Sequence, residues 1–572
     1  MEFPAISPSK SFHFPANFPG KHETHFHILL RKTSLRCKTR RVRVAHPAFN
    51  ENNSSISVST ASTDQSDQES ISFNNGKDWI HFVGIGGCGL SALAMLALKQ
   101  GYEVSGSDIE WNSSMDRLQE AGARLHIGHS VTNMQGNTSS RLPNAVVISS
   151  AIPQNNMEIL YAKSVGVPVY KRDYWLGKLT QHYKLIAVSG SHGKSTTSGM
   201  LAYVLNAMGG DLAAVIGAQV PQLSEGNIIS GGSETFVLEA DEYDGCFLKL
   251  SPYIAVVTNV DWEHVDIFQD EEAVKTTFRR FLNQIRKDGH LIICGDREGA
   301  YSLLNHCKQA TNLDASEGAI SIPSSEPSAY RITTYGITNS NEWHASSIRQ
   351  NSIGGCDYTL CHRGCPVADI SLQIPGIHNV LNSLAVIATV ITAVGSKSNL
   401  YDTIHHLRLH LQGFRGVSRR FEMIGSIYGC QIFDDYAHHP TEVCAVLQAA
   451  RQRFPLKSLL VVFQPHTYSR LAALKDEFSI ALSCADQVVV TGVYAARDAD
   501  YWNVSGKTLS DSIIGLPCEY IPSLGDVVDK LAYQVCEDPY RDIVILTLGA
   551  GDITTVGRKL LKRLQRELLV NS

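Results

Sequence analysis

Two glycine-rich segments of the chain have the residue types needed to hold phosphate groups. The first, Gly84–Gly89, has the spacing GxGxxG through Gly84, Gly86 and Gly89. Small residues at these positions let backbone N–H groups and a helix N-terminus approach a pyrophosphate. Asp108 lies 19 residues after Gly89, where a carboxylate could reach a ribose. By itself this segment predicts a dinucleotide or nucleotide-diphosphate ligand, and a tight strand–helix turn without a ligand is the alternative.

The second segment, Gly190–Thr197, has the sequence GSHGKSTT and predicts a loop that cradles a triphosphate. Backbone amides and Lys194 would meet the β- and γ-phosphates, and Ser195 or Thr196 can offer a hydroxyl to Mg²⁺. Gly190 and Gly193 enclose only two residues, so the loop is two residues shorter than the pattern GxxxxGK[ST]. The chain therefore has one predicted diphosphate site and one predicted triphosphate site.

Acidic residues follow two predicted strands downstream of this loop. The strand Thr235–Leu238 is followed by Glu239-Ala240-Asp241-Glu242, and the strand Ile254–Thr258 is followed by the segment Asn259–Asp266, which includes His264. Carboxylates at the carboxyl ends of strands are usual ligands of Mg²⁺ in α/β sheets. Any one of these residues alone is better explained as a solvated loop residue. Together with Lys194 they predict a metal–triphosphate site.

The thirteen cysteines are dispersed and include no CxxC pair. The only cluster is Cys356, Cys361 and Cys365, which we interpret as reduced thiols in a loop. A zinc site there would need a fourth ligand, for which His362 and His378 are the candidates.

The elements that would position these residues begin at Lys77, where short Val/Ile-rich runs start to alternate with helical stretches. This alternation is typical of parallel α/β units. It predicts domains at residues 77–180, 181–417 and 418–572. The predicted strands are Trp79–Val83, Tyr102–Ser105, Ala145–Ser149, Leu185–Ser189, Thr235–Leu238, Ile254–Thr258, a strand around Phe421, Gln431–Phe433, Leu459–Phe463, Gln487–Thr491 and Ile543–Leu548, and the predicted helices beside the glycine loops are Leu90–Lys99 and Ser198–Met208.

Residues 1–76 have a different composition. The first 60 residues are rich in Ser, Arg and Lys, carry a net charge of +6 and lack the apolar core of a secretory signal. They resemble an organellar transit peptide, and residues 50–75 predict a disordered spacer. We expect import into the chloroplast stroma because the N-terminus is rich in Ser and Pro. Import into mitochondria and a solvated tail on a cytoplasmic protein are the alternatives.

Composition excludes several classes of protein. The 572 residues are 43% hydrophobic and 18% charged, as in a globular protein, and suffice for three to four domains. Residues 61–572 carry a net charge of −11, which argues against a nucleic-acid-binding surface. The apolar run Leu384–Val394 is 11 residues, shorter than a bilayer requires, so we expect no membrane insertion.

A series of ordered segments resembles the motifs of the Mur ligase family over residues 77–570. These segments are Gly84–Ala94, Gly190–Thr197, Glu239–Phe247, Asn259–Asp266, Pro375–Asn382, Arg419–Glu422, Asp434–Glu442, Phe463–Arg470 and Leu548–Ile553. They are most similar to the members that join L-alanine to UDP-N-acetylmuramate. Another group of members, which attach a tripeptide to the same acceptor, is the nearest alternative. The tyrosine at position 243, within the segment Glu239–Phe247, is more similar to the motif of that group.

The resemblance implies an α/β fold of three domains: a Rossmann-like UDP domain, a central P-loop-type ATPase domain and a C-terminal Rossmann-like domain. It implies ATP-dependent amide formation with Mg²⁺, in which the substrate carboxylate becomes an acyl phosphate that the amine of L-alanine attacks. This chemistry needs charge neutralisation and positioning rather than a protein nucleophile. It also implies a monomer or homodimer and a hinge near Gly413–Arg419.

The resemblance also implies the binding residues. The UDP-sugar would be bound by Gly84, Gly86, Gly87, Gly89, Asp108, Ser149 and Ser150. ATP would be bound by Gly190, Ser191, His192, Gly193, Lys194, Ser195, Thr196, Asn379, Asn382, Arg420 and Asp435. Magnesium would be bound by Ser195, Glu239 and His264, and the catalytic group would be Lys194, Glu239, His264 and Arg420.

The amino acid would be held by His466 and Arg470, since a guanidinium can bind a carboxylate with two parallel hydrogen bonds. Residue 467 is Thr, where some members have a basic residue. Two functions of other classes stay open. A nicotinamide oxidoreductase would leave Lys194 and Glu239 unused, and a non-catalytic plastid protein would keep the fold alone.

Overall fold

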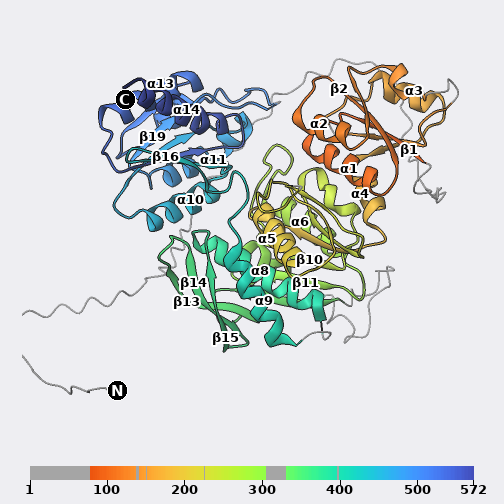
Figure 1. Ribbon diagram of the computed structural model, residues 1–572, viewed down its shortest axis with the longest axis horizontal. Coiled ribbons are helices and arrows are strands. Elements are labelled where there is room, and N and C mark those ends of the chain that lie inside the picture. Colours follow the sequence, from red (N-terminus) through yellow and green to blue (C-terminus); the bar gives the residue numbers. More distant parts are fainter. Residues whose placement is uncertain are drawn as a thin grey trace, which may run out of the picture. The chain divides into compact units, whose positions relative to one another are not determined.

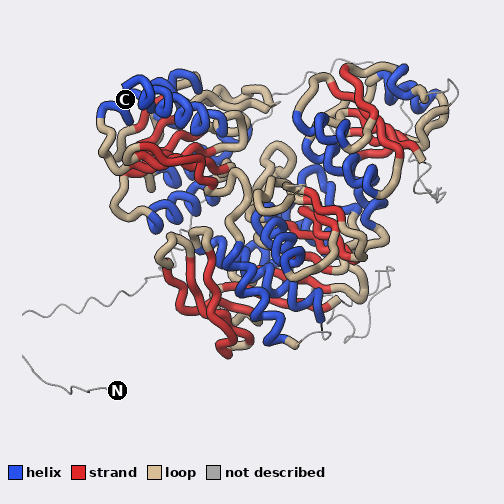
Figure 2. Tube along the Cα trace, viewed as in Figure 1, coloured by secondary structure: helices blue, strands red, loops and turns tan. Residues whose placement is uncertain are grey.

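The computed structural model describes residues 78–136, 141–149, 151–224, 226–304, 330–395, 399–496 and 498–571. In these residues three β-sheets follow one another along the chain, each flanked by helices (Figures 1 and 2). The predicted leader and spacer, residues 1–76, and the predicted sugar-site residue Ser150 lie outside the described residues.

The first sheet is parallel throughout and has the strand order β3-β2-β1-β4-β5. Its central strand is buried on both faces, as expected for a parallel sheet covered by helices. The carboxyl ends of its strands meet at one edge, where the first glycine loop begins. Its elements are β1 (Trp79–Val83), α1 (Cys88–Lys99), β2 (Glu103–Asp108), α2 (Ser113–Glu120), β3 (Arg124–Ile127), η1 (Val131–Met134), β4 (Ala145–Ile148), α3 (Met157–Ser164), β5 (Val169–Lys171) and α4 (Arg172–Thr180).

The second sheet has ten strands in the order β15-β14-β13-β12-β11-β10-β6-β9-β7-β8. Its elements are β6 (Lys184–Ser189), α5 (Lys194–Ala207), β7 (Ala213–Val215), β8 (Ile228–Ser230), β9 (Thr235–Glu239), η2 (Tyr243–Lys249), β10 (Ile254–Val257), α6 (Glu271–Leu282), β11 (His290–Cys294), β12 (Arg331–Gly336), β13 (Trp343–Gln350), β14 (Cys356–His362), β15 (Cys365–Leu372), α8 (Ile377–Val394) and α9 (Leu400–Gly413). The predicted alternation of strands and helices is wrong for β13–β15, which pair antiparallel through short turns. Residues 351–355 connect β13 to β14, and residues 363–364 connect β14 to β15. Both connections are too short for the crossover helices that parallel strands require.

The cysteine cluster lies in this antiparallel part and not in a loop. Cys356 and Cys361 are buried in β14, and Cys365 is exposed at the start of β15; all three are free thiols. His362 stacks on Trp343 with ring centroids 4.2 Å apart. Among the described residues no group of possible metal ligands includes these thiols, so the zinc alternative receives no support.

Helix α8 is 18 residues long and, by length and composition alone, apolar enough to cross a membrane. It is 67% buried inside the domain and packs on α5, β11 and β12. An apolar helix covered on most sides is typical of the core of a large domain. The run Leu384–Val394 is the second half of this helix.

The third sheet has the order β16-β17-β21-β18-β19-β20, and all its pairs are parallel except β16 with β17. Helices α10 and α11 contribute to the core on one face, and α13 and α14 to the core on the other (Figure 1). The elements are β16 (Glu422–Ile427), β17 (Cys430–Asp435), α10 (Pro440–Arg453), β18 (Ser458–Phe463), α11 (Tyr468–Leu482), β19 (Gln487–Val490), α12 (Gly506–Ser510), β20 (Cys518–Tyr520), α13 (Leu524–Glu537), β21 (Ile543–Leu548) and α14 (Thr554–Asn571).

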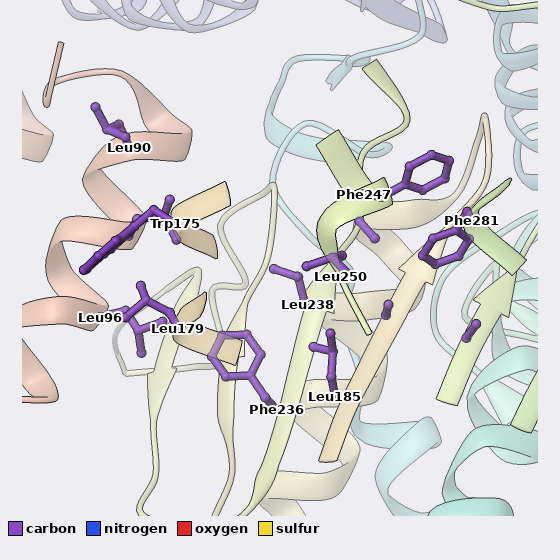
Figure 3. Packing of buried hydrophobic residues seen from close by; sticks show 14 of the residues in the cluster. Leu90, Leu96, Trp175, Leu179, Leu185, Phe236, Leu238, Phe247, Leu250 and Phe281 are labelled. Atoms are coloured by element: carbon purple, nitrogen blue, oxygen red, sulfur yellow. The ribbon is translucent and has the colours of Figure 1, made fainter. Parts of the chain in front are cut away.

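One cluster of buried apolar side chains joins α1 and α4 to the central sheet. It includes Leu96, Trp175 and Leu179, together with Phe236 of β9 and Phe247 of η2 (Figure 3). Burial of large apolar side chains is the main stabilising contribution in such a cluster. Helix α4 therefore packs with both the first domain and the central domain.

The chain passes from the central domain to the third within residues 414–421. The backbone N–H of Ser418 donates to the carbonyl of Gln219 (2.8 Å), in the central domain. The carbonyl of the next residue, Arg419, accepts from the N–H of Tyr436 (2.8 Å), in the third domain. Ser418 is thus hydrogen-bonded to the central domain and its neighbour Arg419 to the third domain, and both lie in the segment for which we predict a hinge.

The first domain also contains a buried carboxylate that sequence analysis did not single out. Glu158 accepts hydrogen bonds from Ser107 Oγ (2.6 Å) and Asn133 Nδ2 (2.7 Å), and its Oε1 lies 3.7 Å from His81 Nε2. Burial alone would raise the pKa of Glu158, but His81 and these hydrogen bonds lower it to about 2. The carbonyl of Ser107 accepts the N–H of Gly84 (2.8 Å), so the network supports the glycine loop.

Glu158→Gln is expected to destabilise the protein by roughly 3 kcal/mol at pH 7, because it removes the negative charge to which the buried partners of Glu158 are hydrogen-bonded. The pKa of Glu158 is lower in the folded state than in the unfolded state. Its contribution is therefore complete above pH 4.5 and is lost as the pH falls from 4.5 towards 2. Denaturant unfolding of both proteins at several pH values measures this. Exposed Glu120→Gln is the control, and equal stability of the Glu158 variant and wild type at pH 7 would contradict the prediction.

Candidate active site

The first glycine loop follows β1 and lies against the ends of β2 and β4. Gly84 has a φ of 83°, and a Cβ atom added there would lie 3.0 Å from Ser149 Cβ. Gly86 N–H donates to Asp108 Oδ2 (2.8 Å), and Asp108 Oδ1 accepts from its neighbour Ile109 N–H (2.8 Å). Asp108 is the last residue of β2 and fixes the loop through its hydrogen bond with Gly86. The fold thus brings Gly84, Gly86, Asp108 and Ser149 together at one edge, with Gly87 and Gly89 in the same loop.

Arg172, which sequence analysis missed, lies over this loop. A Cβ atom added at Gly89 would lie 2.5 Å from Arg172 Nη1, and Arg172 Nη2 lies 3.3 Å from Cys246 Sγ of η2. Arg172 is the first residue of α4. A guanidinium beside a glycine loop supplies the positive charge that the loop itself lacks for a pyrophosphate.

The phosphate loop connects β6 to α5, and Gly193, with φ 83°, caps the helix. The helix begins at Lys194, four residues before the predicted start at Ser198, so Lys194, Ser195 and Thr196 form its first turn. Their N–H groups belong to the helix N-terminus, which favours bound anions. His192 N–H donates to Asn259 Oδ1 (2.8 Å), which ties the loop to the segment after β10. Gly190 and Ser191 complete the loop.

Lys194 forms an ion pair with Glu242, an acid to which the sequence analysis assigned no role. Its Nζ donates to both carboxylate oxygens of Glu242 (2.8 and 3.0 Å) and lies 3.9 Å from Asp241 Oδ1. Burial opposes the charge of Lys194, but the two carboxylates raise its pKa above the usual value. Glu242 is 1% exposed; burial raises its pKa to about 7, although Lys194 opposes this.

The predicted magnesium ligands fall into two adjacent sets. Ser195 Oγ donates to Glu239 Oε1 (2.9 Å), whereas His264 belongs to a group with Asp241 and Glu242 whose ligand atoms all lie within 4.8 Å of one another. Burial, reinforced by Lys194, lowers the pKa of His264 to about 4. His264 is therefore neutral at pH 7, the form in which imidazole can bind a metal. Carboxylate and hydroxyl oxygens suit Mg²⁺, so the residues fit the metal that we expect.

A cavity of about 610 Å³ lies between the central and third domains. Its lining includes the predicted ATP residues His192, Gly193, Thr196, Asn379, Asn382, Arg420 and Asp435. Asn382 lies against the phosphate loop, since a Cβ atom at Gly193 would be 2.7 Å from Asn382 Oδ1. The volume is within the range of cofactor sites. Arg297, Arg415 and Arg453 also line the cavity, and sequence analysis missed all three.

Asp435 positions the backbone that carries Arg420. Its oxygens accept the N–H groups of Phe421 (2.7 Å) and Ala437 (2.8 Å). Burial raises the pKa of Asp435 to about 6, and the charge of Arg420 opposes this. Phe421 has a φ of 51°, a left-handed conformation that is rare for aromatic residues and that the hydrogen bond to Asp435 helps to hold. Arg420 lies over the ring of Tyr436, 4.7 Å from its centroid.

His466 and Arg470, the predicted amino-acid residues, are in contact. Arg470 Nη1 lies 3.1 Å from His466 Nδ1, and burial lowers the pKa of His466 to about 3, so His466 is neutral. Thr467 caps α11 by accepting the N–H of Arg470. Arg470 Nη2 donates to Glu263 Oε1 (3.0 Å), a residue of the central domain. The predicted amino-acid site and the predicted phosphate site therefore adjoin.

His192 is the centre of an acidic group at this junction. Its Nδ1 lies 3.3 Å from both Glu263 Oε2 and Glu442 Oε1, and its Nε2 lies 3.4 Å from Asp261 Oδ2. Burial opposes protonation, but the three carboxylates raise the pKa of His192 to about 10. His192 is thus a buried imidazolium within the phosphate loop, next to helix α10 of the third domain.

Comparison with known proteins shows three consecutive family matches. The catalytic-domain model of the Mur ligase family matches residues 79–184, the Mur ligase middle domain matches 188–390, and the Mur ligase glutamate ligase domain matches 419–551. The chain belongs to the Mur ligase family. This membership confirms both the predicted family and the three-domain α/β fold.

Two curated relatives have the same name, UDP-N-acetylmuramate--L-alanine ligase. The protein of Frankia casuarinae is 40% identical, covering 85% of this chain and 97% of the relative, and that of Caldanaerobacter subterraneus is 35% identical, covering 84% and 97%. Among solved structures, the UDP-N-acetylmuramate-alanine ligase of Thermotoga maritima matches with a TM-score of 0.66 and 27% identity, covering 85% of this chain and 99% of that one. A murein peptide ligase of Psychrobacter arcticus matches with a TM-score of 0.59 and 22% identity, covering 85% and 98%, and shows the shared fold.

Proposed function

We propose that this Mur ligase joins L-alanine to the carboxylate of UDP-N-acetylmuramate, with ATP and Mg²⁺, through an acyl phosphate. One observation carries the proposal: Glu263 contacts both His192 of the phosphate loop and Arg470. The phosphate loop and Arg470, whose guanidinium suits an amino-acid carboxylate, are thus both in contact with Glu263. The names of the curated relatives support the same substrates.

The residues of the phosphate site would act by positioning and charge. Lys194 and the first amides of α5 would hold the β- and γ-phosphates, and Arg420 would approach the γ-phosphate from the third domain. Ser195, Glu239 and His264 would hold Mg²⁺, which when bound neutralises charge on the phosphoryl group. Asn379 and Asn382 line the nucleotide cavity beside this loop.

The two organic substrates would be bound by different domains. The first glycine loop, with Arg172 above Gly89, would hold the diphosphate of the UDP-sugar. Arg470 and neutral His466 would hold the carboxylate of L-alanine and leave its amine directed at the acyl phosphate. Orienting two bound reactants supplies much of the rate enhancement in such a reaction.

Phosphate release by the full chain tests this function. ATP and Mg²⁺ are supplied with UDP-N-acetylmuramate, and L-alanine is compared with other amino acids and with a tripeptide amine. We expect release with L-alanine. A preference for the tripeptide would identify the reaction of the tripeptide-attaching members, and no release with any amine would support a non-catalytic role. Oxidation of a reduced nicotinamide cofactor would instead support an oxidoreductase.

We further propose that the protein acts in the chloroplast stroma. The basic, Ser-rich composition of residues 1–76 supports this, because it is typical of transit peptides. Residues 1–76 fused to a fluorescent reporter are expected to direct it into plastids, and residues 77–572 fused to the same reporter are not. Location of the first fusion in mitochondria or in the cytoplasm would contradict the proposal.

A further inference from the structure

Glu263 contacts three basic side chains from three separate segments. Its Oε1 accepts from Arg470 Nη2 (3.0 Å) and lies 3.4 Å from His438 Nε2, and its Oε2 lies 3.3 Å from His192 Nδ1. Glu263 is 3% exposed. Arg470 and His438 belong to the third domain, whereas His192 belongs to the phosphate loop. A single buried carboxylate therefore connects the amino-acid residues to the nucleotide loop.

Arg470 needs such a partner. Arg470 is 4% exposed, and a buried guanidinium is strongly unfavourable unless a carboxylate compensates its charge. Within the described residues, Glu263 is the carboxylate for which a contact with Arg470 is observed. His466, on Nη1, is neutral and does not compensate the charge.

One donor of Arg470 is still available for a ligand. Its Nε is buried and has no hydrogen-bond partner in the structure, whereas Nη2 is held by Glu263 and Nη1 lies beside His466. A buried donor without an acceptor is unfavourable, so an acceptor is expected at this position. The carboxylate of an amino acid would supply that acceptor while Glu263 keeps the guanidinium in its orientation.

We propose that Glu263 is a positioning residue for the amino-acid substrate, which holds Arg470 in place and, through His192, makes amino-acid binding depend on the phosphate loop. This inference rests on the proposed ligase function. A movement of the phosphate loop on binding ATP moves His192 and hence changes the pairing of Glu263. Binding of ATP and binding of L-alanine are therefore coupled through this one carboxylate.

The test is steady-state kinetics of the full chain with Glu263→Gln. We expect the KM for L-alanine to rise by roughly 30-fold or more, the scale for losing one partner of a buried charge pair, while the KM values for ATP and UDP-N-acetylmuramate change by less than about threefold. The kcat at saturating L-alanine should fall much less than kcat/KM. Glu263→Asp keeps the charge and should restore part of the affinity.

Two controls separate this role from general destabilisation. Glu272→Gln makes the same substitution at an exposed ion pair with Arg279 and should leave all three KM values unchanged. In a double-mutant cycle, Glu263→Gln should add little to the L-alanine KM of Arg470→Ala, since both changes remove the same interaction. Thermal unfolding checks that each variant is folded, and Glu263→Asp provides the measurement if Glu263→Gln does not fold.

Direct binding tests the coupling. The affinity for L-alanine, measured with UDP-N-acetylmuramate present, should change when a non-hydrolysable ATP analogue is added to the wild type and should not change in Glu263→Gln. An unaltered L-alanine KM in the variant, an equal rise in all three KM values, an additive cycle or unchanged coupling would each overturn the inference. Failure of the proposed function is distinguishable, because the wild type itself would then release no phosphate with L-alanine.

Discussion

Lys194→Ala is expected to lower kcat by roughly 10³-fold, the scale for removing a group that stabilises charge in a phosphoryl-transfer transition state. Lys194 begins α5, at the end of the phosphate loop, and its Nζ is 2.8 Å from Glu242 Oε2. Without Lys194, Glu242 remains buried beside Asp241 and is expected to bind a proton, because the pKa of Glu242 is already raised. The substitution should therefore remove activity without unfolding the protein.

Phosphate release at saturating substrates measures this effect, and thermal unfolding of the same protein shows whether it is folded. Lys184→Ala is a matched control, since Lys184 begins β6, the strand that leads into the phosphate loop, and forms an exposed ion pair with Glu234 (2.8 Å). The control should retain full activity. Near-normal phosphate release by Lys194→Ala would show that this loop is not the catalytic phosphate site.

The sequence predicts the parallel strands well, for a physical reason. Trp79–Val83 and Ile543–Leu548 are predicted with the bounds that the structure has, because strands buried on both faces are continuous apolar runs. The start of α5 is misplaced because Lys194–Thr197 carry the residue types of a phosphate loop while their backbone is helical. Strands β13–β15 are missed because each is only partly buried and their pairing depends on turns rather than on apolar runs.

The site is predictable where its residues are close in sequence. The two glycine loops and the acids after β9 are local patterns. The structure places the phosphate loop and these acids at the carboxyl ends of neighbouring strands, β6 and β9, and the first glycine loop at the carboxyl end of β1 in another sheet. Glu263 and Arg470 are 207 residues apart, so their contact depends on the packing of two domains. Arg172 is likewise distant in sequence from Gly89. A single sequence shows which residue types are present but not which of them become partners.

Arg470→Ala is expected to raise the KM for L-alanine by roughly 10²-fold or more, corresponding to a few kcal/mol for loss of a buried, charge-assisted pair. The KM values for ATP and UDP-N-acetylmuramate should change little, because neither substrate is expected to touch Arg470. Thr467 has no charge and already caps α11, so it cannot replace the guanidinium. Arg470→Lys keeps the charge without the planar fork and should give an intermediate KM.

The fold should tolerate this change because Glu263 keeps His192 and His438 as partners after Arg470 is removed. Arg451→Ala is the control, since it removes a half-exposed ion pair with Asp486 (2.8 Å) in the same domain, away from the nucleotide cavity. Initial rates with varied L-alanine, and with a tripeptide as competing amine, decide between the outcomes. An unchanged L-alanine KM would show that the carboxylate binds elsewhere. A selective rise would place it at Arg470, beside the carboxylate that links this residue to the phosphate loop.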